Sequence, residues 1–208
     1  MYFDEDLLLD LRLNILNEYV DKFVIIEAEE DHQGNKRKLN FDITKFNKFK
    51  SKIDYVSLKK INIDDKIKLK KNWDIGHLRD QSMRNEIQNN LVEADEEDWI
   101  IISDLDEIPN PLKIQEFKSR KKFAFFEQNF FYYKFDLYIP NFIWHGTKAC
   151  KKKDLISPQW LRNVKCKKYP KYRIDIFFNK KKYNNIQFIK NGGWHFSNIK
   201  SPEEIELK

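Results

Sequence analysis

Apolar and polar residues alternate along the first half of the chain in patterns that predict helices and strands in turn. Residues 5–20 and 76–92 have apolar side chains at helical spacing, so each is predicted to form an amphipathic helix. Short apolar runs at 22–28, 55–58 and 99–102 predict strands. The third run has no polar alternation, which is typical of a strand buried on both faces. The predicted buried side of the first helix carries Leu8, Leu11, Ile15 and Tyr19, widened by Leu7 and Leu16.

The second half of the chain has a β-rich pattern. Residues 122–126 and 129–138 are dense in aromatic side chains and are predicted strands. A short helix is predicted over residues 111–118 because proline is favoured at the first helical position. Helix–strand units therefore come first, and a more β-rich region follows.

The segments between these elements contain no internal repeat, low-complexity tract or linker. Residues 41–49 are predicted to form a short amphipathic segment, and the basic, weakly patterned residues 59–71 are predicted to be a loop. The continuous pattern predicts one α/β domain over residues 1–208.

An acidic turn follows the strand predicted over residues 99–102. Asp104 and Asp106 are two residues apart, which in an extended chain places both carboxylates on one side. Two converging carboxylates repel each other unless a cation lies between them. A divalent metal ion would supply that charge and keep positions open for phosphate oxygens. Glu107 orients the two aspartates, caps the next turn or is a solvated acid. The whole turn is alternatively a polar loop in water.

A second informative segment lies near the C-terminal end of the chain. Gly192 and Gly193 give the backbone freedom to approach a ligand closely, and Trp194 adds a large ring. His195 is a candidate metal ligand that would complete a shell with the two aspartates. The alternative is a hairpin turn followed by a core tryptophan and a hydrogen-bonded histidine.

Four further polar residues are candidates for contacts with a nucleotide. Arg79, Arg84 and Asn85 lie on the predicted helix before the acidic turn, and arginine is suited to bidentate phosphate contacts. Glu27 ends the first predicted strand, where it is placed to meet a sugar or base hydroxyl. The alternative for each is a solvated surface position.

Composition narrows the class of protein. The 208 residues are 41% hydrophobic, which argues against disorder, and 15% aromatic. The net charge of +6 comes from interleaved residues of both signs, so no nucleic-acid partner is expected. Two cysteines are too few for a disulfide framework or a zinc pattern. No apolar run reaches the ~20 residues that span a bilayer, so no transmembrane segment is expected.

The motifs occur in an order that resembles glycosyltransferase family 17. The segments that carry the resemblance are 3–13, 20–27, 103–109 and 193–197, followed by 201–203. The resemblance implies a GT-A-like domain with a mixed, mostly parallel central sheet flanked by helices. It also implies a nucleotide-sugar donor, with UDP-GlcNAc expected, and a glycan or glycoprotein acceptor. Family members in animals are Golgi-anchored, whereas this chain is expected in the cytoplasm or the cytosol of a host cell.

The resemblance also assigns roles to residues. It implies Mn²⁺ or Mg²⁺ at Asp104 and Asp106. The residue types themselves predict His195 as a further metal ligand and Gly193 and Trp194 as contacts of the nucleotide. Transfer with inversion needs a base for the acceptor hydroxyl, for which Glu127 is the first candidate and Asp154 the second. Aromatic residues are candidates for stacking on acceptor sugars or for core packing, namely Phe130 to Tyr133, Trp144 and Trp160.

Two other functions compete with glycosyl transfer. One is a carbohydrate-binding module that keeps the fold without catalysis, against which Asp104, Asp106 and His195 argue. The other is a metal-dependent nucleotidyltransferase, which would need further acids clustered for a second metal ion.

Overall fold

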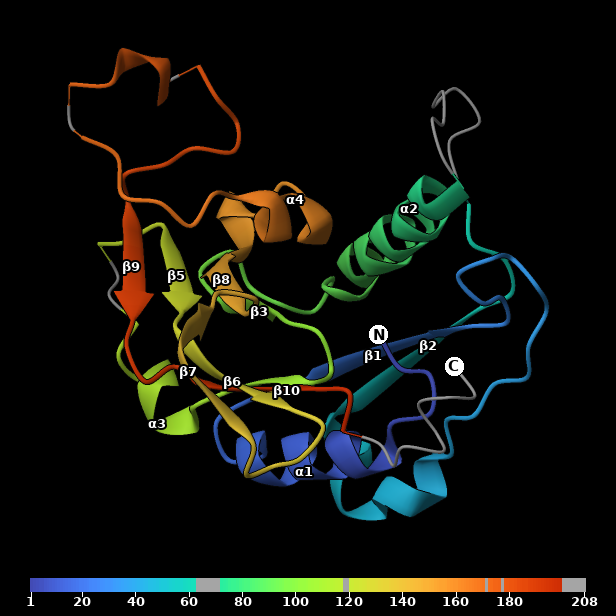
Figure 1. Ribbon diagram of the computed structural model, residues 1–208. Coiled ribbons are helices and arrows are strands. Elements are labelled where there is room, and N and C mark those ends of the chain that lie inside the picture. The colour runs from blue at the N-terminus through green and yellow to red at the C-terminus, as the bar shows by residue number, and fades with distance from the viewer. Residues whose placement is uncertain (63–71, 118–119, 171, 177, 200–208) are drawn as a thin grey trace. The chain divides into compact units, whose positions relative to one another are not determined.

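The computed structural model describes residues 1–62, 72–117, 120–170, 172–176 and 178–199 (Figure 1). The chain divides into two compact units, which are described separately. Unit 1 is Met1–Ala94 with Ser157–Gln159, and unit 2 is Asp95–Ile156 with Trp160–Lys208. In the described residues, no helix has the length and apolar character needed to cross a membrane. The prediction of a single domain stays a prediction.

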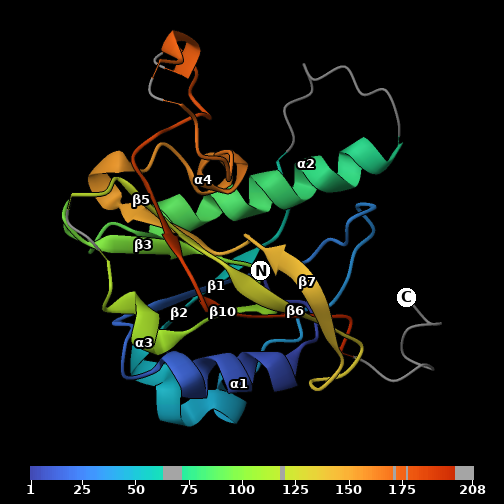
Figure 2. The ribbon, with the colours of Figure 1, turned by 60° about the vertical axis from the view of Figure 1, so that its left-hand side comes forward.

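Unit 1 is built on a pair of parallel strands, β1 (Phe23–Ala28) and β2 (Ile53–Leu58). Helices α1 (Asp6–Leu16) and α2 (Asn72–Asn85) lie on opposite sides of this pair (Figures 1 and 2). Met83 of α2 packs with Ile26 and Ala28 of β1. The remaining elements are the 3₁₀ helices η1 (Ile43–Lys52) and η2 (Glu86–Asn90).

The helices of unit 1 confirm the predicted elements and correct their details. Helix α1 buries Leu8, Leu9, Leu13 and Leu16, whereas Leu7 is 64% exposed. The buried side is therefore rotated from the predicted one, because Leu9, Leu13 and Leu16 also satisfy helical spacing. Helix α2 begins four residues before the predicted start, and most of the predicted loop 59–71 lies outside the described residues.

Unit 2 contains two four-stranded sheets. One has the order β3-β8-β5-β9 and the other β4-β10-β6-β7. The strands of the first are β3 (Trp99–Ile102), β8 (Lys148–Lys151), β5 (Phe123–Phe126) and β9 (Ile186–Ile189). Those of the second are β4 (Glu107–Pro109), β10 (Gly193–Ser197), β6 (Gln128–Tyr132) and β7 (Tyr138–Trp144). The helices are α3 (Pro111–Ile114), η3 (Lys152–Asp154) and η4 (Ile174–Ile176), while α4 (Pro158–Asn163) is divided between the two units.

The sheets are mixed, as expected, but they are not mostly parallel. Among the described strands, three pairs are parallel, namely β1/β2, β10/β6 and β5/β9. Four pairs are antiparallel, namely β10/β4, β3/β8, β5/β8 and β6/β7. The prediction of a mostly parallel sheet was wrong. Strand β8 lies between β3 and β5 and runs antiparallel to both, and β6 and β7 form an antiparallel hairpin.

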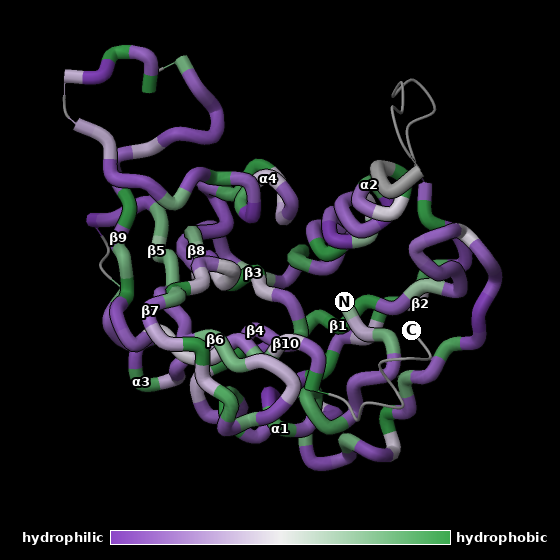
Figure 3. Tube along the Cα trace, in the orientation of Figure 1, coloured by the Kyte–Doolittle hydropathy of each residue, from purple (hydrophilic) through white to green (hydrophobic). Residues whose placement is uncertain are grey.

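Strand β3 is an edge strand and not a strand in the middle of a sheet. Ile100 and Ile102 are buried on one face, while Trp99 and Ile101 are half-buried on the other against the cluster of Ala124, Phe126, Ala149 and Ile189. Both faces are therefore apolar although the strand pairs only with β8. The fully buried centre of this sheet is β5, whose residues are hydrophobic throughout (Figure 3).

The two cysteines are free thiols in different surroundings. Cys150 is buried in β8, and burial raises its pKa to about 12, whereas Cys166 is exposed. Because the thiolate is the reactive form, we expect an aromatic disulfide reagent to titrate one thiol in the native protein at pH 8 and two in denaturant. Cys166→Ser should remove the native-state reaction. Rapid native titration of two thiols would contradict the burial of Cys150.

Candidate active site

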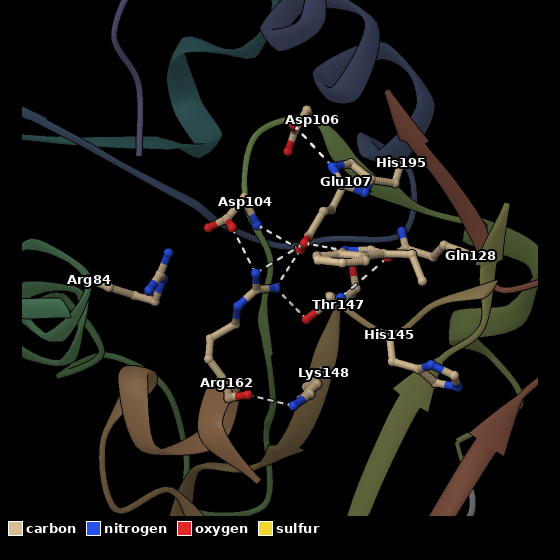
Figure 4. Close-up of polar contacts among 12 residues, drawn as sticks. Arg84, Asp104, Asp106, Glu107, Gln128, His145, Thr147, Lys148, Arg162 and His195 are labelled. Carbon is tan, nitrogen blue, oxygen red and sulfur yellow. Dashed lines mark hydrogen bonds and ion pairs between the residues drawn. The ribbon is translucent and has the colours of Figure 1, made fainter. Parts of the chain in front are cut away.

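The acidic turn of unit 2 is organised around a buried arginine. Arg162 of α4 donates through Nη2 to Asp104 Oδ2 at 2.7 Å and to Glu107 Oε1 at 3.0 Å (Figure 4). Its Nη1 donates to Glu107 Oε2 at 2.5 Å. Nη1 also donates to the carbonyl of Gly146. The planar guanidinium thus forms two parallel hydrogen bonds with the Glu107 carboxylate, and its Nη2 also binds Asp104.

Glu107 is a buried member of this cluster and not a solvated acid. Its side chain is 1% exposed, and it accepts hydrogen bonds from Trp144 Nε1 at 2.6 Å and from the backbone nitrogen of Asp104 at 3.0 Å. Together with Arg162, these donors satisfy both of its oxygens. The hypothesis that Glu107 orients the aspartates is confirmed for Asp104.

The chain turns between Asp104 and Glu107 and does not continue as an extended strand. The backbone nitrogen of Glu107 donates to the carbonyl of Asp104 at 3.1 Å, which closes the turn. The predicted reason for the two carboxylates to share one side was therefore wrong. Asp104 is held by Arg162, while Asp106 has a different partner, His195.

Charge explains why Arg162 stays protonated in this place. Burial lowers the pKa of its guanidinium, but the carboxylates of Glu107 and Asp104 outweigh burial and raise it above its ordinary value. One cation faces two acids, and Asp106 adds a third negative charge nearby. The cluster carries a net negative charge, which favours a further cation beside it.

Asp106 and His195 form the second half of the site. His195 Nε2 lies 3.2 Å from Asp106 Oδ2, and the backbone nitrogen of Phe196 donates to the carbonyl of Asp106 at 2.9 Å. The imidazole is 4.6 Å from the ring of Phe130 and 4.8 Å from that of Trp144, between ring centroids. Its Nδ1 is buried with no hydrogen-bond partner among the described residues. Within the same residues, no group of three or more His, Cys, Asp or Glu side chains is arranged to hold a metal ion.

Lys148 holds the backbone at and after Arg162. It is 4% exposed in β8, and Nζ donates to the carbonyls of Arg162 at 2.5 Å and Val164 at 2.7 Å. These carbonyls belong to the last turn of α4 and the residues after it, where intrahelical donors run out. Burial lowers the pKa of Lys148. The lysine fixes the helix end that carries the guanidinium, and it was not among the predicted site residues.

Gly193 and Trp194 are the first two residues of β10. Gly193 has φ +126°, and a Cβ there would lie 2.2 Å from the carbonyl of Ile108, so the glycine is needed for the pairing of β10 with β4. Trp194 follows in the same strand, so its side chain lies on the opposite face from His195. The role of Gly193 and Trp194 toward a nucleotide stays a prediction.

The two candidate bases lie at opposite ends of the β3–β8–β5 sheet. One row across the sheet is formed by Ile102, Lys148 and Phe125. Asp104 and Glu127 each lie two residues beyond this row, so they follow the C-terminal ends of β3 and β5 at the same end of the sheet. Asp154 instead follows the other end of β8, where it pairs with Lys122 at 2.9 Å. Asp154 therefore lies at the other end of this sheet from Asp104 and Glu127, and its role as the base stays a prediction.

Glu27 is fully buried in unit 1 and is occupied by the chain itself. Oε1 accepts from Arg37 Nη2 at 2.8 Å and from the backbone nitrogen of Asn40 at 2.7 Å. Oε2 accepts from the backbone nitrogen of Phe41 at 3.0 Å and from the Tyr55 hydroxyl at 2.8 Å. Its observed role is to fasten the loop that follows β1.

The predicted phosphate contacts of α2 also lie in unit 1. Arg79 Nη1 pairs with Glu30 Oε2 at 2.6 Å, and Arg84 donates to Gln159 Oε1. Asn85 Oδ1 accepts from the backbone nitrogen of Gln159 at 3.0 Å. These contacts stabilise unit 1, and the role of the three residues toward a nucleotide stays a prediction.

Comparisons with known proteins identify the family. The family model described as Glycosyltransferase family 17 matches residues 1–157 of the 208. The match includes the acidic turn, Glu127 and Trp144, and it ends before Arg162 and His195. No curated protein and no solved structure matches the chain. Because the family match extends over more than half of the sequence, the chain belongs to glycosyltransferase family 17.

Proposed function

We propose that this glycosyltransferase moves a sugar from a nucleoside-diphosphate donor to a glycan acceptor with inversion, and that UDP-GlcNAc is the donor. The observation that supports the proposal most is the cluster of Asp104, Asp106 and His195 beside the buried Arg162–Glu107 pair. It is a negatively charged site with one histidine, and its acids follow a core strand in a chain of a glycosyltransferase family.

The residues present fit a divalent cation at Asp106 and His195. Two neighbouring ligands on an octahedral ion with bonds of about 2.0–2.1 Å are about 3 Å apart. The 3.2 Å between Asp106 Oδ2 and His195 Nε2 is close to that separation. An imidazole ligand favours Mn²⁺, because Mg²⁺ prefers oxygen. When bound, the ion supplies positive charge for the departing diphosphate.

Glu127 is the base that the geometry supports. In the reaction, the acceptor oxygen bonds to the anomeric carbon while the bond from that carbon to the diphosphate oxygen breaks. The electron pair leaves with the diphosphate, and the hydroxyl proton passes to the Glu127 carboxylate. Asp104 and Glu127 follow the ends of β3 and β5, and β8 lies between these two strands, so the strand ends are about 10 Å apart at strand spacings of ~4.8 Å. That spacing leaves room for a sugar ring beside the two strand ends.

His145 stands next to the proposed base. Its Nε2 lies 3.9 Å from Glu127 Oε1, and both side chains are about one quarter exposed, at 27% and 26%. Burial lowers the pKa of His145, so its imidazole is neutral near pH 7. A neutral imidazole places no positive charge beside the Glu127 carboxylate.

Calorimetry with UDP tests the proposed ion site. We expect UDP to bind at least about tenfold more tightly in Mn²⁺ than in EDTA, because the acids of the site repel a bare diphosphate. Asp106→Asn should remove most of that difference, since the amide is a weaker ligand.

The matched control is Asp154→Asn, which alters an aspartate at the far end of β8 and should retain the full effect of Mn²⁺. Equal UDP affinity in Mn²⁺ and EDTA for the unaltered protein would contradict the ion site. Release of UDP from UDP-GlcNAc, measured in parallel, separates an enzyme from a non-catalytic sugar-binding module.

A further inference from the structure

One face of the β4-β10-β6-β7 sheet carries a row of aromatic rings that begins at the active site. Because side chains alternate along strands, Phe130 and Tyr132 of β6 lie on the face of His195, with Phe142 and Trp144 of β7 beside them. We call these four rings the aromatic face.

The rings of the aromatic face are in mutual contact. The Phe130 centroid is 4.6 Å from that of His195, 5.1 Å from that of Phe142 and 6.1 Å from that of Tyr132. Trp144 lies 4.8 Å from His195 and donates its Nε1 hydrogen to Glu107. The face therefore joins the acidic cluster at Trp144 and extends away from it along β7.

The aromatic face is open to solvent in the part farthest from Glu107. Phe142 is 44% exposed, and Phe130, Tyr132 and Trp144 are only half-buried. Rings of this size are usually buried, so several half-exposed rings in contact mark an interaction surface. Polar groups border them, since Asn198 Nδ2 donates to the Tyr132 hydroxyl at 3.2 Å and Tyr133 is 42% exposed.

We infer that the aromatic face binds the glycan acceptor, an inference that rests on the proposed function. A sugar ring has an apolar C–H side and a rim of hydroxyl groups. It matches a surface that presents ring faces for stacking and a few tyrosine and amide groups for orientation. A purely apolar partner would make no hydrogen bond with the hydroxyl and amide groups at the border of the face. Continuity with Trp144 directs a chain of sugars on this face toward Glu107 and Asp104.

Two adjacent residues of β7 give a matched test. Phe142 and Ile143 are both 44% exposed, but successive residues of a strand face opposite sides. Phe142→Ala should raise the KM for the acceptor roughly 3- to 10-fold, as expected for the loss of one stacking ring. Ile143→Ala should leave that KM unchanged. Neither variant should change the KM for UDP-GlcNAc or the rate at which water releases UDP from it.

Direct binding provides a second readout that does not depend on turnover. Saturation-transfer NMR with mannotriose, chitotriose and lactose should detect binding of at least one probe to the unaltered protein, and Phe142→Ala should weaken it. The inference is overturned if the unaltered protein and Phe142→Ala bind the probes equally, or if none of the three probes binds. Transfer without sensitivity to Phe142 overturns the inference and leaves the proposed function standing. Probe binding without any UDP release removes the proposed function and leaves a sugar-binding surface.

Discussion

Replacing Arg162 with methionine is expected to lower the free energy of unfolding by about 3–5 kcal/mol, which is the usual cost of leaving a buried charge without its partner. Glu107 is 1% exposed and receives two of its hydrogen bonds from the guanidinium. Without Arg162, its carboxylate must either remain charged in an apolar surrounding or take up a proton. Urea unfolding followed by circular dichroism measures the change.

Two further variants separate charge from shape. Arg162→Lys keeps the positive charge but loses the planar fork, so it should recover only part of the stability. Arg162→Met combined with Glu107→Gln removes both charges and should recover most of it. Transfer should stay low in the double variant, because Asp104 has lost the group that positions it. A loss below about 1 kcal/mol in Arg162→Met would contradict the buried pair.

The sequence was sufficient to predict the elements that carry the site. The apolar run 99–102 is strand β3, and the segment 193–197 that contains His195 is strand β10. Asp106 and His195 were predicted to act together, and their side chains lie 3.2 Å apart. These predictions rest on local pattern and on motif order, which need no knowledge of how the strands pair.

The support of the site was beyond the reach of sequence reasoning. Arg162 and Lys148 stand in a region where lysine and arginine are frequent, so nothing in their local pattern distinguishes them from surface residues. Their importance comes from burial against Glu107 and against the end of α4, which only the fold creates. One signal was available. Glu107 is followed directly by the apolar residues Ile108 and Pro109, and an acid that is buried with them needs a basic partner from elsewhere in the chain.

The arrangement of the strands explains why one predicted base is favoured over the other. Motif order alone could not decide between Glu127 and Asp154, since neither lies in a segment that carries the family resemblance. The antiparallel strand β8 separates them, because one end of β8 meets the ends of β3 and β5 while the other leads to Asp154. The direction of the strands thus places Glu127, and not Asp154, at the same end of the sheet as Asp104.

Replacing Glu127 with glutamine is expected to lower kcat for transfer by about 10²- to 10⁴-fold, the usual contribution of a general base. The amide has nearly the same shape as the carboxylate but cannot accept the proton of the acceptor hydroxyl. Glu127 holds its place mainly through its backbone, which accepts from the nitrogen of Gly192 at 2.8 Å and donates to the carbonyl of Ile189 at 2.9 Å. The fold and the affinity for UDP in Mn²⁺ should therefore be retained.

Asp154→Asn is the matched control for this prediction, because the same change of charge is made at the opposite end of β8. It should transfer sugar at nearly the rate of the unaltered enzyme. His145→Gln tests the neighbouring imidazole, which lies 3.9 Å from Glu127. If His145→Gln abolished transfer while Glu127→Gln did not, the proton would pass to the histidine. A Glu127→Gln enzyme of normal kcat would remove the carboxylate from the reaction, because no other property of the side chain is lost in that substitution.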